Sequence, residues 1–128
     1  MTGRYKVVIL GATGLVGQRL QELLFDHPFF HVVAIAGSPN SVGLMHEEIE
    51  WRLSSQRPNY DILICSMSDI PDVDIAFSAL PSNVAEVVEP SLVARGIHVF
   101  SNASAFRRIA GIPLVIPEVN PEDMQSYD

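Results

Sequence analysis

The apolar and polar positions along this chain alternate between short apolar runs and amphipathic stretches. The first apolar run covers residues 7–10 and leads into glycines at positions 11, 14 and 17. Two sets of residues then recur at helical spacing on opposite faces, the apolar Val16, Leu20, Leu23 and Leu24 and the polar Gln18, Arg19, Gln21 and Glu22. This pattern predicts a buried strand, a tight glycine turn and an amphipathic helix.

Further apolar runs predict the remaining strands of a single sheet. They cover residues 31–36, 61–67, 74–80 and 97–100, with a candidate for a short sixth strand at residues 114–116. Residues 45–58 predict a short helix or an irregular crossover. The alternation of strand and helix predicts an α/β fold, a Rossmann-like doubly wound and mostly parallel sheet with helices on both faces. We find no interdomain linker, so residues 1–128 are expected to form one domain.

A second amphipathic stretch predicts a helix over residues 83–95. Its expected apolar side carries Val84, Val87, Val88 and Leu92. Ser82 stands where it can cap the helix, and Gly96 is a natural stop after the last turn. Pro90 lies inside the stretch and predicts either a kink or a division into two pieces.

Composition places this chain among globular proteins of one domain. Of its 128 residues, 48% are hydrophobic, and no apolar run reaches the roughly 20 residues that span a bilayer. The formal net charge of -7 argues against general nucleic-acid binding, which needs a basic face. The single cysteine, Cys65, excludes an internal disulfide and any metal site with several cysteines. With no signal-peptide pattern before the first strand, we expect a cytoplasmic protein with no metal, membrane or nucleic-acid partner.

The glycine turn near the start of the chain is suited to an anion. Gly11 and Gly14 allow the backbone to approach a ligand closely, and the N–H groups of the first helical turn carry a positive partial charge. Gly17 lets the helix pack closely on the strand, so a dinucleotide pyrophosphate is the expected occupant. The spacing G-A-T-G also occurs in short-chain dehydrogenases and nucleotide-sugar epimerases, and glycines that serve turn geometry alone are the alternative. Epimerases are disfavoured because no tyrosine of the chain has a lysine four residues on.

A loop of turn-forming residues, 37–43, follows the second predicted strand, where a Rossmann protein meets the adenosine ribose. NAD-specific sites usually carry Asp or Glu at the end of this strand. Ser38, Asn40 and Ser41 stand here without a nearby carboxylate, which leaves room for a 2′-phosphate and favours NADP. No Arg or Lys of the loop can pair with that phosphate, and a plain surface loop is the alternative interpretation.

Three stretches in a fixed order go beyond a general nucleotide-binding pattern. They are G-A-T-G-L-V-G-Q-R at residues 11–19, S-A-L-P-S at residues 78–82, and S-N-A-S-A-F-R at residues 101–107 followed by P-L-V-I-P-E-V-N-P-E. Together they resemble the N-terminal NADP-binding region of aspartate-semialdehyde dehydrogenase, particularly its archaeal and fungal branch. Members of that family reduce aspartyl phosphate to aspartate semialdehyde with NADPH, or run the reverse reaction, through a cysteine thioester. They are homodimers or homotetramers built largely through a second domain.

The resemblance implies which residues bind the cofactor. They are Gly11, Thr13, Gly14, Leu15 and Val16 for the pyrophosphate, Ser38, Asn40 and Ser41 for the adenosine ribose and its phosphate, Ser78, Leu80 and Pro81 at the edge of the crevice, and Asn102 near the nicotinamide. Family members commonly have Arg where Asn40 stands. Residues 78–81 also suit a strand end and helix cap, and Asn102 also suits an ordinary turn.

Arg107 matches the family arginine that binds the phosphate of the substrate. A guanidinium offers a planar fork of donors for a pair of phosphoryl oxygens. A solvated loop arginine is the alternative, and Arg108 and Ile109 follow where the family usually has Met-Asp.

The resemblance also implies that the catalytic groups lie outside these 128 residues. The family nucleophile stands in an Asn–Cys motif downstream of P-E-V-N-P, and its histidine comes later still. We therefore expect a cofactor domain without its catalytic and dimerisation domain, inactive by itself. Cys65 lies in a buried strand pattern, which raises the pKa of a thiol and is typical of a structural residue. No histidine has a recognisable catalytic context, neither His27, His31, His46 nor His98.

Two alternatives stay open. Another acyl-phosphate or acyl-CoA reductase, such as N-acetyl-glutamyl-phosphate reductase or malonyl-CoA reductase, shares the glycine turn and the crevice. A stand-alone nucleotide-sensing Rossmann module is the alternative from a different class. A reading frame that continues past Asp128 into an Asn–Cys segment would favour a dehydrogenase, and a natural stop would favour the sensor.

Overall fold

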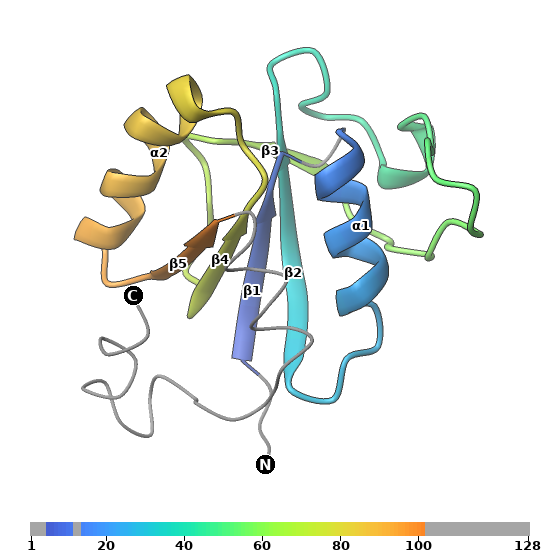
Figure 1. The fold of residues 1–128 in the computed structure, drawn as a ribbon, viewed down its shortest axis with the longest axis horizontal. Coiled ribbons are helices and arrows are strands. Elements are labelled where there is room, and N and C mark those ends of the chain that lie inside the picture. The colour runs from blue at the N-terminus through green and yellow to red at the C-terminus, as the bar shows by residue number, and fades with distance from the viewer. Residues whose placement is uncertain (1–4, 12–13, 102–128) are drawn as a thin grey trace.

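The computed structural model describes residues 5–11 and 14–101. Its centre is a five-stranded sheet in which every neighbouring pair of strands is parallel, in the order β3-β2-β1-β4-β5 (Figure 1). The strands are β1 (Tyr5–Leu10), β2 (Phe30–Gly37), β3 (Ile64–Ser66), β4 (Ile75–Ser78) and β5 (His98–Ser101). The connections hold the helices α1 (Leu15–Leu24) and α2 (Ser82–Ala94) and one turn of 3-10 helix, η1 (His46–Glu48). Within the described residues, neither α-helix has the length and apolarity to span a bilayer.

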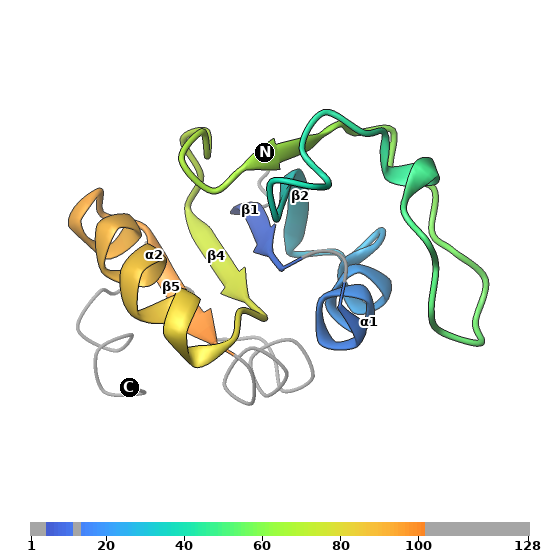
Figure 2. The ribbon, with the colours of Figure 1, turned by 90° about the horizontal axis from the view of Figure 1, so that it is seen from above.

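The sheet has a hydrophobic core on each face, which confirms the doubly wound α/β fold. Alternate residues of β1 point to opposite faces, so Val7 and Ile9 lie in the core under α1, and Val8 and Leu10 lie in the core under α2. Figure 2 places α1 and α2 on opposite sides of β1 and β4. Because both faces are covered, the central strand is a continuous apolar run and shows no alternation.

The buried face of α1 matches its apolar spacing only in part: Leu20 and Leu24 lie in the core as predicted, but the buried face is shifted around the helix. Gln18 and Gln21 are both 1% exposed, whereas Val16 and Leu23 are 41% and 40% exposed. The expectation of an outward polar face that includes these glutamines is therefore wrong. The physical reason is that residues 46–60 pack beside α1 and provide polar partners for both amide side chains, which compensates the cost of burying them.

Hydrogen bonds fasten residues 46–60 to α1. Nε2 of Gln18 donates to the carbonyl oxygen of Glu50, and Oε1 of Gln18 accepts from the backbone N–H of Arg52, both at 2.7 Å. The carbonyl oxygen of Gln21 accepts from the hydroxyl of Tyr60 at 2.6 Å. This connection between β2 and β3 is irregular apart from the single turn η1, which confirms the predicted crossover.

The helix α2 begins without a side-chain cap and continues through a proline. Ser82 is its first residue, and Pro81 in the N-cap position makes no capping hydrogen bond. The expected cap at Ser82 is wrong, because its hydroxyl lies inside the helix rather than before it. Pro90 lies within the continuous helix, so a division into two pieces is wrong as well. Leu92 holds the last turn in the core, while Val87, expected on the apolar side, is 74% exposed.

The end of α2 follows the predicted glycine stop. Gly96 has φ +87°, and its N–H donates to the carbonyl oxygen of Val93 at 2.9 Å. The N–H of Ile97 donates to the carbonyl oxygen of Leu92 at 3.1 Å. This pair of bonds is a Schellman motif, which satisfies carbonyl groups of the last turn and directs the chain into β5.

Candidate functional site: the crevice at the carboxyl ends of β1 and β4

The strand order places the topological switch point of the sheet at the carboxyl ends of β1 and β4, where open α/β sheets have their ligand crevice. From β1 the chain passes through α1 to β2 on one side, and from β4 it passes through α2 to β5 on the other. Figure 1 shows both helices beginning at the upper edge of the sheet, one on each side of these two strands. In open α/β sheets, ligands bind at such a switch point.

Gly11 packs the turn after β1 against the end of β4. It has φ +85°, and a Cβ added to it would lie 3.0 Å from the carbonyl oxygen of Ala79. Two backbone hydrogen bonds fix this contact, from the N–H of Gly11 to Ala36 at 3.0 Å and from the N–H of Ala79 to Leu10 at 2.9 Å. Only a residue without a side chain fits here, which is the geometry expected for the first glycine of the turn.

Both helices that begin at the crevice have uncapped N-terminal ends. The N-cap residues, Gly14 of α1 and Pro81 of α2, make no side-chain capping hydrogen bond, and neither first turn holds an acidic residue. Among the described residues, nothing lies within 4 Å of a Cβ added to Gly14, and Leu15 and Val16 are exposed, so none of their side chains fills the space beside the start of α1. The N–H groups of an uncapped helix start attract an anion such as a diphosphate.

The loop after β2 lies beside this turn, because β2 pairs with β1. Ser38 and Asn40 are exposed, whereas Ser41 is buried. The N–H of Ser41 donates to the carbonyl oxygen of Ser38 at 2.9 Å, and the N–H of Leu44 donates to that of Ser41 at 3.1 Å. The structure thus brings Ser38 and Asn40 to the same end of the sheet as the glycine turn, whereas Ser41 is buried.

The predicted site residues at the end of β4 differ in their exposure to solvent. Ser78 is fully buried, and its Oγ lies 3.5 Å from the backbone nitrogen of Leu80, to which it offers an acceptor. Leu80 is itself buried in the core under α2, whereas Pro81 is exposed. The strand-end interpretation therefore suits Ser78 and Leu80, and Pro81 is the member of this group with an open face.

Three predicted site residues, Thr13, Asn102 and Arg107, lie outside the residues that the structure describes. The candidate sixth strand at residues 114–116 lies outside them too. The roles of these residues stay predictions.

Cys65 has the environment of a structural residue. It lies in β3, an outer strand, opposite Ala36 of β2. Burial raises the pKa of its thiol, and the negative charge of Asp69 acts in the same direction. Because Cys65 is the single cysteine of the chain, the sequence holds no thiol that its surroundings activate. Among the residues that the structure describes, no group of three or more His, Cys, Asp or Glu side chains could hold a metal ion.

The structure also shows a buried histidine that no sequence pattern identified. His46 is 3% exposed, and its Nε2 lies 2.5 Å from Oε1 of Gln21, to which it donates. Its ring packs against the edge of Tyr60, with 5.3 Å between the ring centroids. Burial lowers the pKa of His46 to about 4, and the positive charge of Arg57 contributes. His46 is therefore a neutral, hydrogen-bonded residue packed beside α1. Its burial depends on a tertiary contact with this helix, which the sequence does not show.

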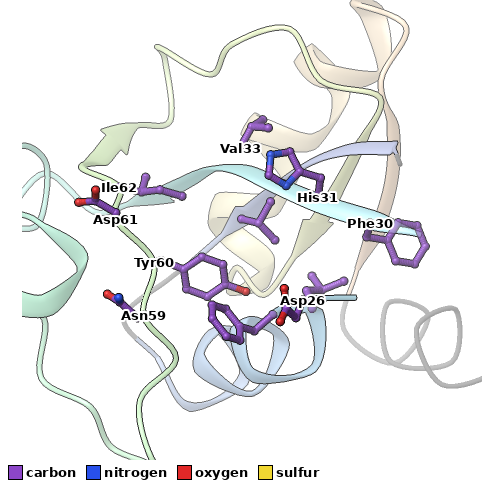
Figure 3. A pocket seen from close by; sticks show the side chains of 11 residues that line it. Asp26, Phe30, His31, Val33, Asn59, Tyr60, Asp61 and Ile62 are labelled. Carbon is purple, nitrogen blue, oxygen red and sulfur yellow. The ribbon is translucent and has the colours of Figure 1, made fainter. Parts of the chain in front are cut away.

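A pocket of about 480 Å³ opens at the other end of the strands, near the start of β2 and away from the crevice. The end of α1, the start of β2 and residues 59–62 surround it (Figure 3). Tyr60 extends across the pocket with its hydroxyl toward Asp26, and burial together with that carboxylate raises the pKa of Tyr60. This pocket is separate from the crevice that the glycine turn forms.

The fold and the crevice define a dinucleotide-binding domain of the doubly wound α/β class. Residues 6–127 match the family described as "Semialdehyde dehydrogenase, NAD binding domain", and the chain belongs to that family. The resemblance that the three sequence stretches indicated is thereby confirmed.

The relatives of this chain include archaeal and fungal enzymes. It is 46% identical to the aspartate-semialdehyde dehydrogenase of Archaeoglobus fulgidus over 125 residues, which cover 94% of this chain and 36% of the relative. It is 38% identical to the malonyl CoA reductase (NADP) of Metallosphaera sedula, over 96% of this chain and 36% of the relative. The crystal structure of the Candida albicans aspartate semialdehyde dehydrogenase with NADP matches with a TM-score of 0.74 and 36% identity, over 96% of this chain and 36% of that one. The chain thus spans about a third of the length of the relatives it matches.

Proposed function

We propose that this chain is the NADP-binding domain of an aspartate-semialdehyde dehydrogenase. The observation that carries the proposal is the open, uncapped start of α1 beside Gly11, at the switch point between β1 and β4. Membership of the family supports the nucleotide class, and the archaeal relative supports the reaction. In the whole enzyme, this reaction would be the reduction of aspartyl phosphate to aspartate semialdehyde, or the reverse phosphorylating oxidation. We also propose that the enzyme is cytoplasmic and assembles as a homodimer or homotetramer.

The residues of this chain would bind and orient the cofactor. The N–H groups at the start of α1 would bind the diphosphate, with Leu15 and Val16 beside it. Ser38 and Asn40 would form hydrogen bonds at the adenosine ribose, and Pro81 would line the crevice. The nicotinamide, when bound, supplies or accepts a hydride. The roles of three further residues, at the turn, the nicotinamide and the substrate phosphate, rest on the resemblance alone: Thr13, Asn102 and Arg107.

Nucleotide titration tests the cofactor assignment. NADP should bind this chain more tightly than NAD, because the loop after β2 carries no carboxylate to repel a 2′-phosphate. Calorimetric titration of both nucleotides, at one salt concentration, gives the two dissociation constants. Equal affinities would remove the preference for NADP, and the absence of binding by either nucleotide would remove the proposed function.

A steady-state assay tests whether this chain is inactive by itself. This chain, supplied with aspartate semialdehyde, phosphate and NADP, should show a rate near background, because acyl transfer needs a thiolate and Cys65 is a buried thiol of raised pKa. The matched variant is Cys65→Ser, which should leave that background unchanged. A substantial rate that survives this substitution would contradict the proposal, since a nucleophile would then lie elsewhere in the chain.

An acyl-CoA reductase of the same architecture is a second candidate. The malonyl CoA reductase, 38% identical to this chain, favours it. Both candidates use the same crevice, and their substrates differ in the acyl group that the thiolate attacks. Assaying the whole enzyme with malonyl-CoA and NADPH, and separately with aspartate semialdehyde, phosphate and NADP, distinguishes them.

A further inference from the structure

The proposed preference for NADP leaves the 2′-phosphate without a cation from its own loop. That phosphate is strongly anionic, and sites that bind it usually supply an arginine. The loop at residues 37–43 contains no Arg or Lys, and Asn40 is an uncharged amide. An arginine for this phosphate would have to come from outside this loop.

Most cations within the described residues are engaged or lie at the wrong edge of the sheet. Lys6 is near the amino end of β1, Arg19 pairs with Glu22 at 2.7 Å, Arg57 donates to the carbonyl oxygens of His46 and Ile49, and Arg95, at the C-terminal end of α2, pairs with Asp72 at 3.3 Å. The remaining cation is Arg52. It is exposed, and within the described residues its guanidinium makes no hydrogen bond or ion pair.

The backbone of Arg52 is fixed beside the start of α1. Its N–H donates to Oε1 of Gln18 at 2.7 Å, and Nε2 of the same buried glutamine holds Glu50 at 2.7 Å. The N–H of Gln18 donates to the carbonyl oxygen of Gly14 at 3.0 Å, so this anchor lies one helical turn from the proposed diphosphate site. Figures 1 and 2 show the segment around residue 50, drawn in green, beside α1 in both views. The backbone of Arg52 is thus held beside the first turns of α1, and its side chain is exposed.

We propose that Arg52 binds the 2′-phosphate of NADP and thereby sets the preference for NADP over NAD. This inference rests on the proposed function. Ser38 and Asn40 would provide the neutral hydrogen-bonding groups, and Arg52 would provide the charge. Gln18 is a positioning residue, because it acts on the phosphate only through the backbone of Arg52.

Arg52→Gln separates this role from general electrostatics. The dissociation constant for NADP should rise about tenfold, the loss expected for one charge-assisted contact, while that for NAD changes less than about twofold. Arg95→Gln is the matched control, since it removes the same charge at the far end of α2 and should leave both constants unchanged. Urea unfolding should show the same stability for Arg52→Gln as for the native chain, because the substitution keeps the backbone bond to Gln18.

A second variant tests whether charge is what Arg52 contributes. Asn40→Arg, made in the Arg52→Gln background, should restore most of the affinity for NADP without changing that for NAD. If Arg52→Gln weakens both nucleotides equally, or weakens neither, Arg52 does not bind the 2′-phosphate. If neither nucleotide binds the native chain, the proposed function fails, and this inference fails with it. Unchanged NAD binding therefore distinguishes a failure of the inference from a failure of the function.

Discussion

Replacing Gly11 by valine is expected to destabilise the fold by about 3 kcal/mol and to abolish nucleotide binding. Gly11 has φ +85°, which a β-branched residue adopts only under strain. A Cβ would also lie 3.0 Å from the carbonyl oxygen of Ala79, a backbone atom that cannot rotate away. The turn would have to shift, and the N–H groups at the start of α1 would shift with it. Urea unfolding measures the first effect, and titration with NADP measures the second.

Gly14→Ala is the matched control for this experiment. Gly14 has φ -85°, and an added Cβ would meet nothing within 4 Å, so the fold should lose less than about 1 kcal/mol. If Gly11→Val does not fold at all, Gly11→Ala keeps the strained φ and the close contact with less bulk, and its loss should still exceed that of Gly14→Ala. Equal stability of the two alanine variants would contradict the account of this turn.

The fold was predictable because its strongest signals are local in the sequence. Each strand of a sheet covered on both faces is a short apolar run, and residues 7–10 ending in Gly11 show this most clearly. The stop at Gly96 was predictable for the same reason, since a residue with positive φ after a helix is usually glycine. Such features need no knowledge of what packs against them.

The burial of Gln18 and Gln21 was not predictable from helical periodicity. Both lie on the face that a polar pattern directs to solvent, and the partners that compensate their burial stand far along the chain. Glu50 and Arg52 are 32 and 34 residues after Gln18, and His46 is 25 residues after Gln21. Only the tertiary structure brings these groups together.

The same distinction applies to the crevice. Gly11 and Gly14, together with the loop that holds Ser38 and Asn40, could be named as candidates because each follows a predicted strand. The burial of Ser78 at the end of β4 agrees with the strand-end interpretation that the sequence also offered, and its role at the cofactor stays a prediction. Arg52 has no motif around it, and its position depends on a hydrogen bond to Gln18.

Acid should weaken this fold through His46. Its pKa is about 4 in the folded chain and 6.5 when solvated, because burial disfavours the charged imidazole and Arg57 adds repulsion. The unfolded chain therefore binds the proton between these values, and the free energy of unfolding falls as the pH drops from 6.5 toward 4. The full difference corresponds to about 3 kcal/mol, and relaxation around the ring reduces the expected loss to roughly 2 kcal/mol.

Comparison of two histidine variants isolates this effect from the carboxylates that also titrate in acid. His46→Gln keeps an amide that can donate to Gln21 but cannot take up a proton, so its stability should fall less than that of the native chain between pH 7 and pH 5. His31→Gln, which removes an exposed imidazole instead of the buried one, is the control. Urea unfolding at both pH values gives the difference. If the native chain and the His46→Gln variant lose stability equally between the two pH values, this prediction is wrong, because the pKa of His46 would then be the same in the folded and unfolded states.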